Sequence, residues 1–438
     1  MLDDDGFVHL FSVCDSIVDC EHKTAPVQSE GIPLIRTTNI KKGWMDIDNA
    51  DRVSEETCRE WSKRMEPKPG DIILAREAPV GGVGMVPFNR RVCLGQRTVL
   101  IRPNQDIITP RYLLYVLLTK QMQNQMKSLA EGSTVPHLNM SAIRKLRVPK
   151  PPSLSEQHFV ARVLGAFDDK MELNHHINST LEKIAQALFK HWFADFEFPD
   201  EAGKPYKSNG GLMQTSELGE IPSTWLVARN LSDLCNRIDY GYTRNATKEA
   251  VGPKFLRVTD INKVDWISWK DVPYCEINEK ELEKYTLQRG DIVVARMADP
   301  GKVAVFEDNI SAVFASYLIR IRPRNPELAY YLYYFMKSKY YQSFILGAES
   351  GSVQKNLNAK GLTRGLPIML PNLDIIKKFS DLVKLLRRRI SKNCVESDIL
   401  MHIRETLLPK MIADRKASTD NEAALSNINV QTSLKQWP

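Results

Sequence analysis

The sequence contains no combination of residues that matches a common catalytic or metal-binding site. Gly301-Lys302 is followed by Val303 and has no glycine before it at the distance that a phosphate-binding loop requires. His175-His176 lacks the spacing of a zinc-binding helix and is predicted to be a solvated pair. A GxSxG nucleophile elbow, a Rossmann-like glycine fingerprint and an Asn/Asp-Pro-Pro-Tyr sequence are also absent. We therefore expect a chain with no catalytic activity and no metal or cofactor of its own.

Polar and basic residues suited to binding nucleic acid occur instead in two similar sets. Most of them follow a predicted strand or lie in a loop that contains glycine, where the backbone can approach a phosphate closely. Their side chains include those that hydrogen-bond to the edges of adenine and guanine in the major groove. The candidates in the first half of the chain are Arg36, Thr38, Asn39, Arg76, Gln96, Arg97, Ser133, Thr134 and His137. Those in the second half are Arg257, Thr259, Arg296, Lys302, Ser352, Gln354 and Lys355.

Two of these arginines have a second interpretation. Arg76 and Arg296 follow matching strands, and each could form an ion pair with a neighbouring acid instead of contacting DNA. The sequence leaves these two alternatives open. Asp71 and Asp291, which begin the same segments, are predicted to form turns.

Composition and charge place the chain among ordinary soluble proteins, and its 438 residues allow two or three domains. Sixty Lys and Arg residues against 53 Asp and Glu give a net charge of +7, which is compatible with an anionic partner without requiring one. The seven cysteines are scattered and never spaced as a CxxC pair, which argues against disulfides and structural zinc and suits a reducing compartment. The acidic start lacks the features of a signal peptide, and no apolar stretch approaches the ~20 residues that cross a bilayer. We therefore expect a cytoplasmic protein without membrane association.

The chain is a tandem repeat. The segment Gly70–Arg76 recurs as Gly290–Arg296, and five of the seven positions are identical. In nearly the same register, Leu34–Ile40 aligns with Phe255–Ile261, and four shorter pairs keep the same order. Several weak matches in a single register indicate an internal duplication.

Each copy is predicted to contain a globular part and a long helix. In the globular parts, short β-rich segments punctuated by Gly and Pro are followed by an amphipathic helix, which indicates a mixed α+β domain. A segment rich in Pro, Gly, Ser and Asn separates the copies. The predicted order is an N-terminal globular domain at 1–152, a first helix at 153–196, a linker at 197–218, a second globular domain at 219–371, a second helix at 372–412 and a polar, flexible tail at 413–438.

Both helices carry the 4-3 spacing of apolar residues that is typical of a coiled-coil seam. Eight of ten seam positions are apolar over 160–192, and seven of ten over 379–411. A helix of about 40 residues is about 60 Å long, too long to pack against its own domain throughout, so we expect the two helices to run antiparallel. Asn174 and Asn393 then lie at their midpoints. They either form a buried pair that fixes the register at some cost in stability, or remain solvated where the seam drifts off the contact face.

This architecture favours a partner with its own repeating symmetry. Two similar domains joined by a rigid antiparallel helix pair would be related by a pseudo-twofold axis. Double-stranded DNA offers two such domains a pair of grooves one helical turn, ~34 Å, apart. Differences between the copies would allow each domain to recognise a different base sequence.

The pattern resembles the specificity subunit of type I restriction–modification systems. The resemblance rests on Gly70-Asp71-Ile72 with Arg76, on their repetition at 290–296, on Ser155-Glu156-Gln157 and on Gly219–Trp225. It covers about residues 7–412 and implies that each globular part is a target recognition domain for one half of a bipartite DNA site. It also implies that the helices set the length of the spacer between the half-sites and dock two methyltransferase subunits. Endonuclease–translocase subunits would join this complex. S-adenosylmethionine, ATP and Mg²⁺ would bind to those partner subunits. The first domain departs from the pattern because it lacks the Gly-x-Ile-Pro-x-x-Trp opening.

The run Arg387-Arg388-Arg389 in the second helix replaces Asp168-Asp169-Lys170 of the first. Such a run is usually a solvated helix face. The alternatives are contact with phosphates of the unread spacer DNA or with an acidic methyltransferase surface.

Two other functions remain compatible with the sequence. In a DNA-free interaction scaffold the two globular domains would bind protein or sugar and the helix pair would only assemble partners, and the chain would show no salt-dependent binding to DNA. A detached recognition subunit of a methylation-only system would bind DNA without a cutting partner.

Overall fold

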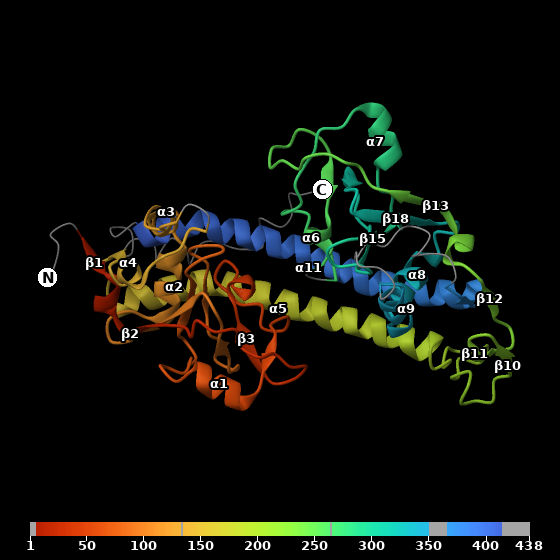
Figure 1. Ribbon diagram of the computed structural model, residues 1–438, viewed down its shortest axis with the longest axis horizontal. Coiled ribbons are helices and arrows are strands. Elements are labelled where there is room, and N and C mark those ends of the chain that lie inside the picture. The colour runs from red at the N-terminus through yellow and green to blue at the C-terminus, as the bar shows by residue number, and fades with distance from the viewer. Residues whose placement is uncertain (1–5, 133–134, 263–264, 350–365, 414–438) are drawn as a thin grey trace, which may run out of the picture. The chain divides into compact units, whose positions relative to one another are not determined.

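The computed structural model describes residues 6–132, 135–262, 265–349 and 366–413 (Figure 1). The chain divides into two compact units: one combines the residues up to Glu172 with those from Ile399 onward, and the other runs from Leu173 to Asp398. The long helices α5 (Leu154–Phe193) and α11 (Leu373–Ala413) each contribute a segment to both units. None of the described helices is long and apolar enough to span a membrane. The tail that was predicted to be flexible lies outside the described residues from 414 onward.

The first unit contains a four-stranded antiparallel sheet with the order β2-β8-β5-β6. Its strands are β2 (Cys14–Asp19), β8 (Thr98–Pro103), β5 (Ile72–Ala75) and β6 (Val83–Met85). Successive side chains of a strand point to opposite faces of the sheet. Ile72 and Leu74 therefore pack with apolar residues of α2 (Pro110–Leu118) and both long helices, whereas Ile73 packs with Ile35 on the other face. Both faces of the central strand are thus buried.

The remaining elements of the first unit surround this sheet. Strand β1 (Phe7–His9) pairs with β9 (Arg147–Pro149), and β4 (Arg52–Val53), β3 (Ile32–Ile35) and β7 (Cys93–Leu94) form a small sheet. The helical elements are η1 (Leu10–Val13), η2 (Thr37–Asn39), α1 (Glu55–Trp61), α3 (Lys120–Ser128) and α4 (Met140–Arg144).

The second unit repeats this topology. Its four-stranded sheet has the order β13-β18-β15-β16, with β13 at Cys235–Tyr240, β18 at Leu318–Pro323, β15 at Ile292–Ala295 and β16 at Val303–Val305. The registers also agree, since Ile72 pairs with Ile101 in the first sheet and the matching Ile292 pairs with Ile321 in the second. The predicted duplication and the mixed α+β class are confirmed.

The other elements of the second unit have counterparts in the first. Strand β14 (Lys254–Leu256) pairs with β17 (Ala312–Phe314) in parallel, and β12 (Leu226–Ala228) pairs with β19 (Ile368–Leu370). The helical elements are η3 (Leu231–Leu234), α6 (Val258–Ile261), α7 (Glu279–Tyr285), α8 (Leu328–Lys337) and α9 (Lys339–Glu349).

The repeated Gly-Asp-Ile segment forms the turn before the central strand in each unit. Gly70 and Gly290 have φ values of +87° and +90°, a conformation that side chains disfavour, so glycine is required at both positions. The carboxylate of Asp71 accepts a hydrogen bond from the Lys68 backbone and forms an ion pair with Arg102 at 2.7 Å. Asp291 makes the equivalent contacts in the second unit. Both aspartates form turns, as predicted.

The predicted linker between the copies is an ordered part of the second unit. Phe198 is buried and stacks on Trp225, with ring centroids 5.2 Å apart. Farther along, β10 (Met213–Ser216) and β11 (Gly219–Pro222) form a hairpin. The polar composition indicated a linker, but the buried aromatic residues fix this segment against the domain core.

Segments of α5 and α11 lie antiparallel in the second unit (Figure 1). A buried polar layer interrupts the apolar seam between them. The Asn393 side-chain amide donates to Oδ1 of Asn178 at 2.8 Å. Asn174 donates to Glu396 and, at 3.3 Å, to Ser397. The structure therefore shows the buried alternative, but the side-chain partner of Asn393 is Asn178, one helical turn from Asn174.

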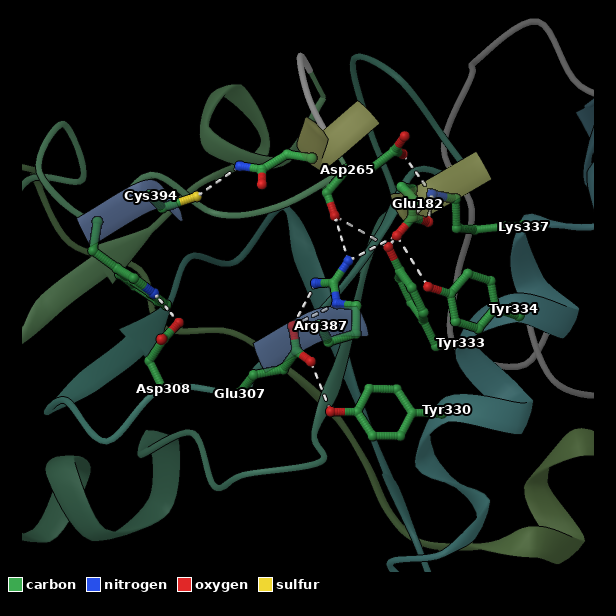
Figure 2. Close-up of polar contacts among 12 residues, drawn as sticks. Glu182, Asp265, Glu307, Asp308, Tyr330, Tyr333, Tyr334, Lys337, Arg387 and Cys394 are labelled. Carbon is green, nitrogen blue, oxygen red and sulfur yellow. Dashed lines mark hydrogen bonds and ion pairs between the residues drawn. The ribbon is translucent and has the colours of Figure 1, made fainter. Parts of the chain in front are cut away.

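A buried guanidinium joins the helix pair to the globular domain of the second unit (Figure 2). Arg387 of α11 is only 4% exposed and donates to Glu182 of α5 and to Glu307, each at 2.9 Å. Lys337 of α8 pairs with the other oxygen of Glu182 at 2.6 Å, and the hydroxyl of Tyr334 donates to Glu182 at 3.0 Å. The solvated-face interpretation and both alternatives are therefore wrong for Arg387, and all three stay predictions for the exposed Arg388 and Arg389.

The sequence pattern missed this contact because a run of three arginines looks the same whichever residue faces inward. Arg387 continues the buried face of Val383 and Ile390, whereas Arg388 and Arg389 are exposed. Burial alone would raise the pKa of Glu182, but Lys337 and Arg387 hold that pKa below its usual value. The carboxylate is therefore ionised at neutral pH.

The first unit has a smaller ion pair of the same kind. Arg404 of α11 is buried and donates to Asp168 of α5 at 2.6 Å. Tyr115 of α2 donates to the other oxygen of Asp168 at 2.6 Å. In both units the acid comes from α5 and the arginine from α11.

The buried asparagine layer yields a stability prediction. Replacing Asn178 by alanine removes the acceptor for the buried Asn393 amide, and an unsatisfied buried donor costs about 1–3 kcal/mol. We expect Asn178→Ala to lower the free energy of unfolding by that amount in urea denaturation. Thr180→Ala, on an exposed turn of the same helix, should change it by less than about 0.5 kcal/mol. Equal effects of the two substitutions would contradict the structure of this layer.

The guanidinium cluster yields a second stability prediction. Arg387→Ala leaves Glu182 and Glu307 without their cation and should destabilise the second unit by about 3–5 kcal/mol. Because the pKa of Glu182 lies below its ordinary value of 4.5, this stabilisation should be complete above that pH and be lost as the pH falls through the folded-state pKa. Thermal unfolding of Arg387→Ala and of the exposed Arg388→Ala measures the difference. A small effect of Arg387→Ala at neutral pH would show that the cluster does not hold the domain.

Candidate nucleic-acid interface

Arg76 in the first unit is held by an ion pair. It follows β5 directly, and its Nη1 lies 2.7 Å from Oδ2 of Asp19, the last residue of β2. The two side chains are only 14% and 15% exposed. Of the two alternatives open for Arg76, the structure therefore shows the ion pair.

Three other candidates lie at the same end of the first sheet. Arg97 is exposed, has a φ of +66° and pairs with Glu77. Gln96 donates to the Thr24 hydroxyl at 3.2 Å. His137 forms two backbone hydrogen bonds with Glu131, and a bridge joins it to Glu77. The structure thus brings Arg76, Gln96, Arg97 and His137 together, whereas Ser133 and Thr134 lie outside the described residues.

The candidates that follow β3 have local structural roles. Asn39 accepts a hydrogen bond from the Arg36 backbone at 3.0 Å, and Arg36 pairs with Asp51 at 2.6 Å. Thr38 is exposed beside them. Asn39 thus closes the turn through its side chain, which reaches back to the amide of Arg36 as the third residue of a capping box does.

The corresponding candidates of the second unit behave in the same way. Arg257 pairs with Asp260 at 2.9 Å, and Asp260 also accepts a hydrogen bond from the Arg257 backbone at 2.8 Å. Thr259 is exposed between them. These residues can present Thr38 and Thr259 to a ligand, but Asn39 and Asp260 are committed to the backbone.

Arg296 in the second unit has a different environment from Arg76. Its guanidinium carbon lies 4.9 Å from the ring centroid of Tyr240, the last residue of β13. No ion pair of Arg296 with a carboxylate occurs among the residues that the structure describes. Lys302 is exposed nearby, and its backbone carbonyl accepts a hydrogen bond from the Ala295 amide at 2.8 Å. Ser352, Gln354 and Lys355 lie outside the described residues.

Both sets therefore gather at equivalent strand ends, with different chemistry. The first combines arginines with carboxylates, and the second combines an arginine with the aromatic ring of Tyr240. Sequence reasoning missed Asp19, Glu77 and Tyr240, because each belongs to a neighbouring strand or turn whose register is known only from the fold.

The family model for the type I restriction modification DNA specificity domain matches twice, at residues 22–183 and 222–393. The chain is 30% identical over 370 residues to the type I restriction enzyme MjaIX specificity subunit of Methanocaldococcus jannaschii, covering 82% of this chain and 80% of that protein. It is 23% identical over 401 residues to the type I restriction enzyme HindI specificity subunit of Haemophilus influenzae, covering 79% and 86% respectively.

Solved structures also align over most of the chain. One of them is the S subunit of a type I restriction–modification system from M. genitalium, with 94% of this chain and 97% of that chain covered, 17% identity and a TM-score of 0.49. The two matches to the family model include most of both globular domains, most of α5 and about half of α11. The chain therefore belongs to the family of type I restriction–modification DNA specificity proteins.

Proposed function

We propose that each globular domain of this specificity subunit recognises one half of a bipartite DNA target. The observation that carries this proposal is the duplication of one sheet topology, with a separate group of polar side chains at the same strand end in each copy. The side chains at the two ends differ, so the two half-sites should differ in base sequence.

Catalysis is assigned to partner subunits. The chain has no recognisable catalytic motif, and its relatives are named specificity subunits of restriction enzymes. In this proposal two methyltransferase subunits and the endonuclease–translocase subunits bind S-adenosylmethionine, ATP and Mg²⁺, and this chain supplies the sequence to which they are directed. Whether the assembly cuts as well as methylates is decided by which partners join it.

The helix pair is proposed to set the distance between the half-sites. Support comes from its continuity, since α5 and α11 are unbroken over 40 and 41 residues. Two buried ion pairs and the asparagine layer fix how the helices pair in each unit. A helix pair held in one register can transmit a fixed length.

Exchange of one domain tests the modular proposal. Residues 7–150 are replaced by the matching domain of a homologue with a different target, and the methylated sequence is determined in cells that also express the methyltransferase subunits. We expect one half-site to change and the other to persist, because each domain carries its own strand-end group. Loss of both half-sites in a folded chimera would contradict modular recognition, and an unmodified wild-type genome would contradict DNA recognition itself.

Matched insertions test the length of the helix pair. One heptad is added after Asn174 and one after Asn393. Asn178 and Asn393 then remain hydrogen-bonded partners on one side of the inserted segment, and Asn174 and Ser397 remain partners on its other side. A heptad of helix is about 10 Å long, or about three base-pair steps, so the double insertion should lengthen the spacer by about that number. Either single insertion should abolish methylation at the native target. Retention of the native spacer by the folded double variant would show that the helices do not set it.

A further inference from the structure

Three positions at the strand ends can be compared directly between the units, because the sheet registers are equivalent. Asp19 pairs with Val99 in the first sheet, and Tyr240 pairs with Ile319, the counterpart of Val99, in the second. Tyr240 therefore occupies the place of Asp19. The backbone amide of Arg76 donates to the carbonyl of Arg97 at 3.0 Å, and that of Arg296 donates to the carbonyl of Tyr317 at 3.0 Å. Tyr317 thus occupies the place of Arg97.

The first unit neutralises its two arginines at this strand end. Asp19 pairs with Arg76, and Glu77 pairs with Arg97. In the second unit neither acid is present, since Tyr240 replaces Asp19 and Met297 follows Arg296 where Glu77 follows Arg76. Compared with the first unit, this strand end of the second unit lacks two carboxylates and has two tyrosines, Tyr240 and Tyr317, at the positions of Asp19 and Arg97.

The guanidinium of Arg296 forms no ion pair with a carboxylate among the residues that the structure describes. Nε of Arg296 is buried and has no hydrogen-bond partner among them. The ring of Tyr240 fixes one face of the guanidinium at 4.9 Å, which orients the planar group. Tyr240 and Tyr317 are 43% and 56% exposed, so large aromatic surfaces reach solvent beside the arginine.

An oriented guanidinium beside exposed aromatic rings suits a nucleobase. Arginine donates two parallel hydrogen bonds to O6 and N7 of guanine, and a tyrosine ring can pack against a base or against the methyl group of thymine. A phosphate would accept the same hydrogen bonds but would gain nothing from the rings. The chemistry of the site therefore favours a base edge over the DNA backbone.

We propose that Arg296, Tyr240 and Tyr317 form a base-contact site in the second domain, and that the equivalent arginine of the first domain, Arg76, is not part of such a site because Asp19 neutralises it. This inference rests on the proposed function, because it assumes that the second domain contacts DNA. Arg296 contacts the base edge, Tyr317 packs beside it, and Tyr240 positions the guanidinium. Arg76 has a structural role in the first domain and does not contact a base.

The test uses the full-length chain in complex with its methyltransferase subunits and duplexes that vary at each base pair of the target. Arg296→Ala should weaken binding of the native duplex roughly 5- to 150-fold and abolish the preference at one base pair of the second half-site. Arg296→Lys should keep most of the affinity but not that preference, because lysine lacks the paired donors. Tyr317→Ala should weaken binding to native DNA and leave the first half-site unchanged.

Controls separate base contact from folding and from phosphate contact. Arg76→Ala should lower the thermal midpoint of the protein and leave the base preference of the first half-site intact. Tyr240→Phe retains the ring and should retain the preference, whereas Tyr240→Ala should lose it.

Three results would overturn the proposal. The first is unchanged DNA binding by Arg296→Ala. The second is that Arg296→Ala loses affinity equally for all duplexes and that the salt dependence of its binding constant falls by about one phosphate contact. The third is loss of the base preference of the first half-site in Arg76→Ala. If the wild-type complex bound all duplexes equally, the proposed function would fail before this inference was reached.

Discussion

The second unit depends on one guanidinium that has been removed from water. Arg387 lies between Glu182 of α5 and Glu307 of the globular domain, and burial of a charged group costs several kcal/mol unless its partners are in place. Only a geometry in which both carboxylates reach the arginine is stable. The helix segments and the domain of this unit must therefore fold together, and the helix pair is not an independent rod with a domain attached.

Much of the fold could be predicted because the duplication supplies two versions of each pattern. A short strand such as Ile72–Ala75 is ambiguous alone, but its repetition as Ile292–Ala295 makes the assignment firm. The seam spacing located both helices for a similar reason. The asparagine partner could not be predicted, because Asn174 and Asn178 both occupy seam positions and side-chain direction, not spacing, decides which one reaches Asn393.

The candidate site was predicted as a list of residues and not as a geometry. Arg76 and Arg296 have the same sequence context, yet an acid neutralises one and a tyrosine stacks on the other. Their partners, Asp19 and Tyr240, are distant in the sequence and end a strand that lies two places from the central one in each sheet. Which side chains meet is decided by the pairing register of the strands. That register cannot be deduced from the sequence of short strands that are buried on both faces.

The distribution of charge between the long helices makes the two halves of the chain non-interchangeable. The seam alignment that matches Asn174 with Asn393 also makes position 168 of the first helix correspond to position 387 of the second. If two first halves paired with each other, Glu182 of one would meet Asp168 of the other in place of Arg387. Two second halves would in turn bring Arg404 against Arg387. Self-association of either half would bury like charges. The charges that differ between the two copies therefore favour pairing of the first helix with the second over pairing of either helix with itself.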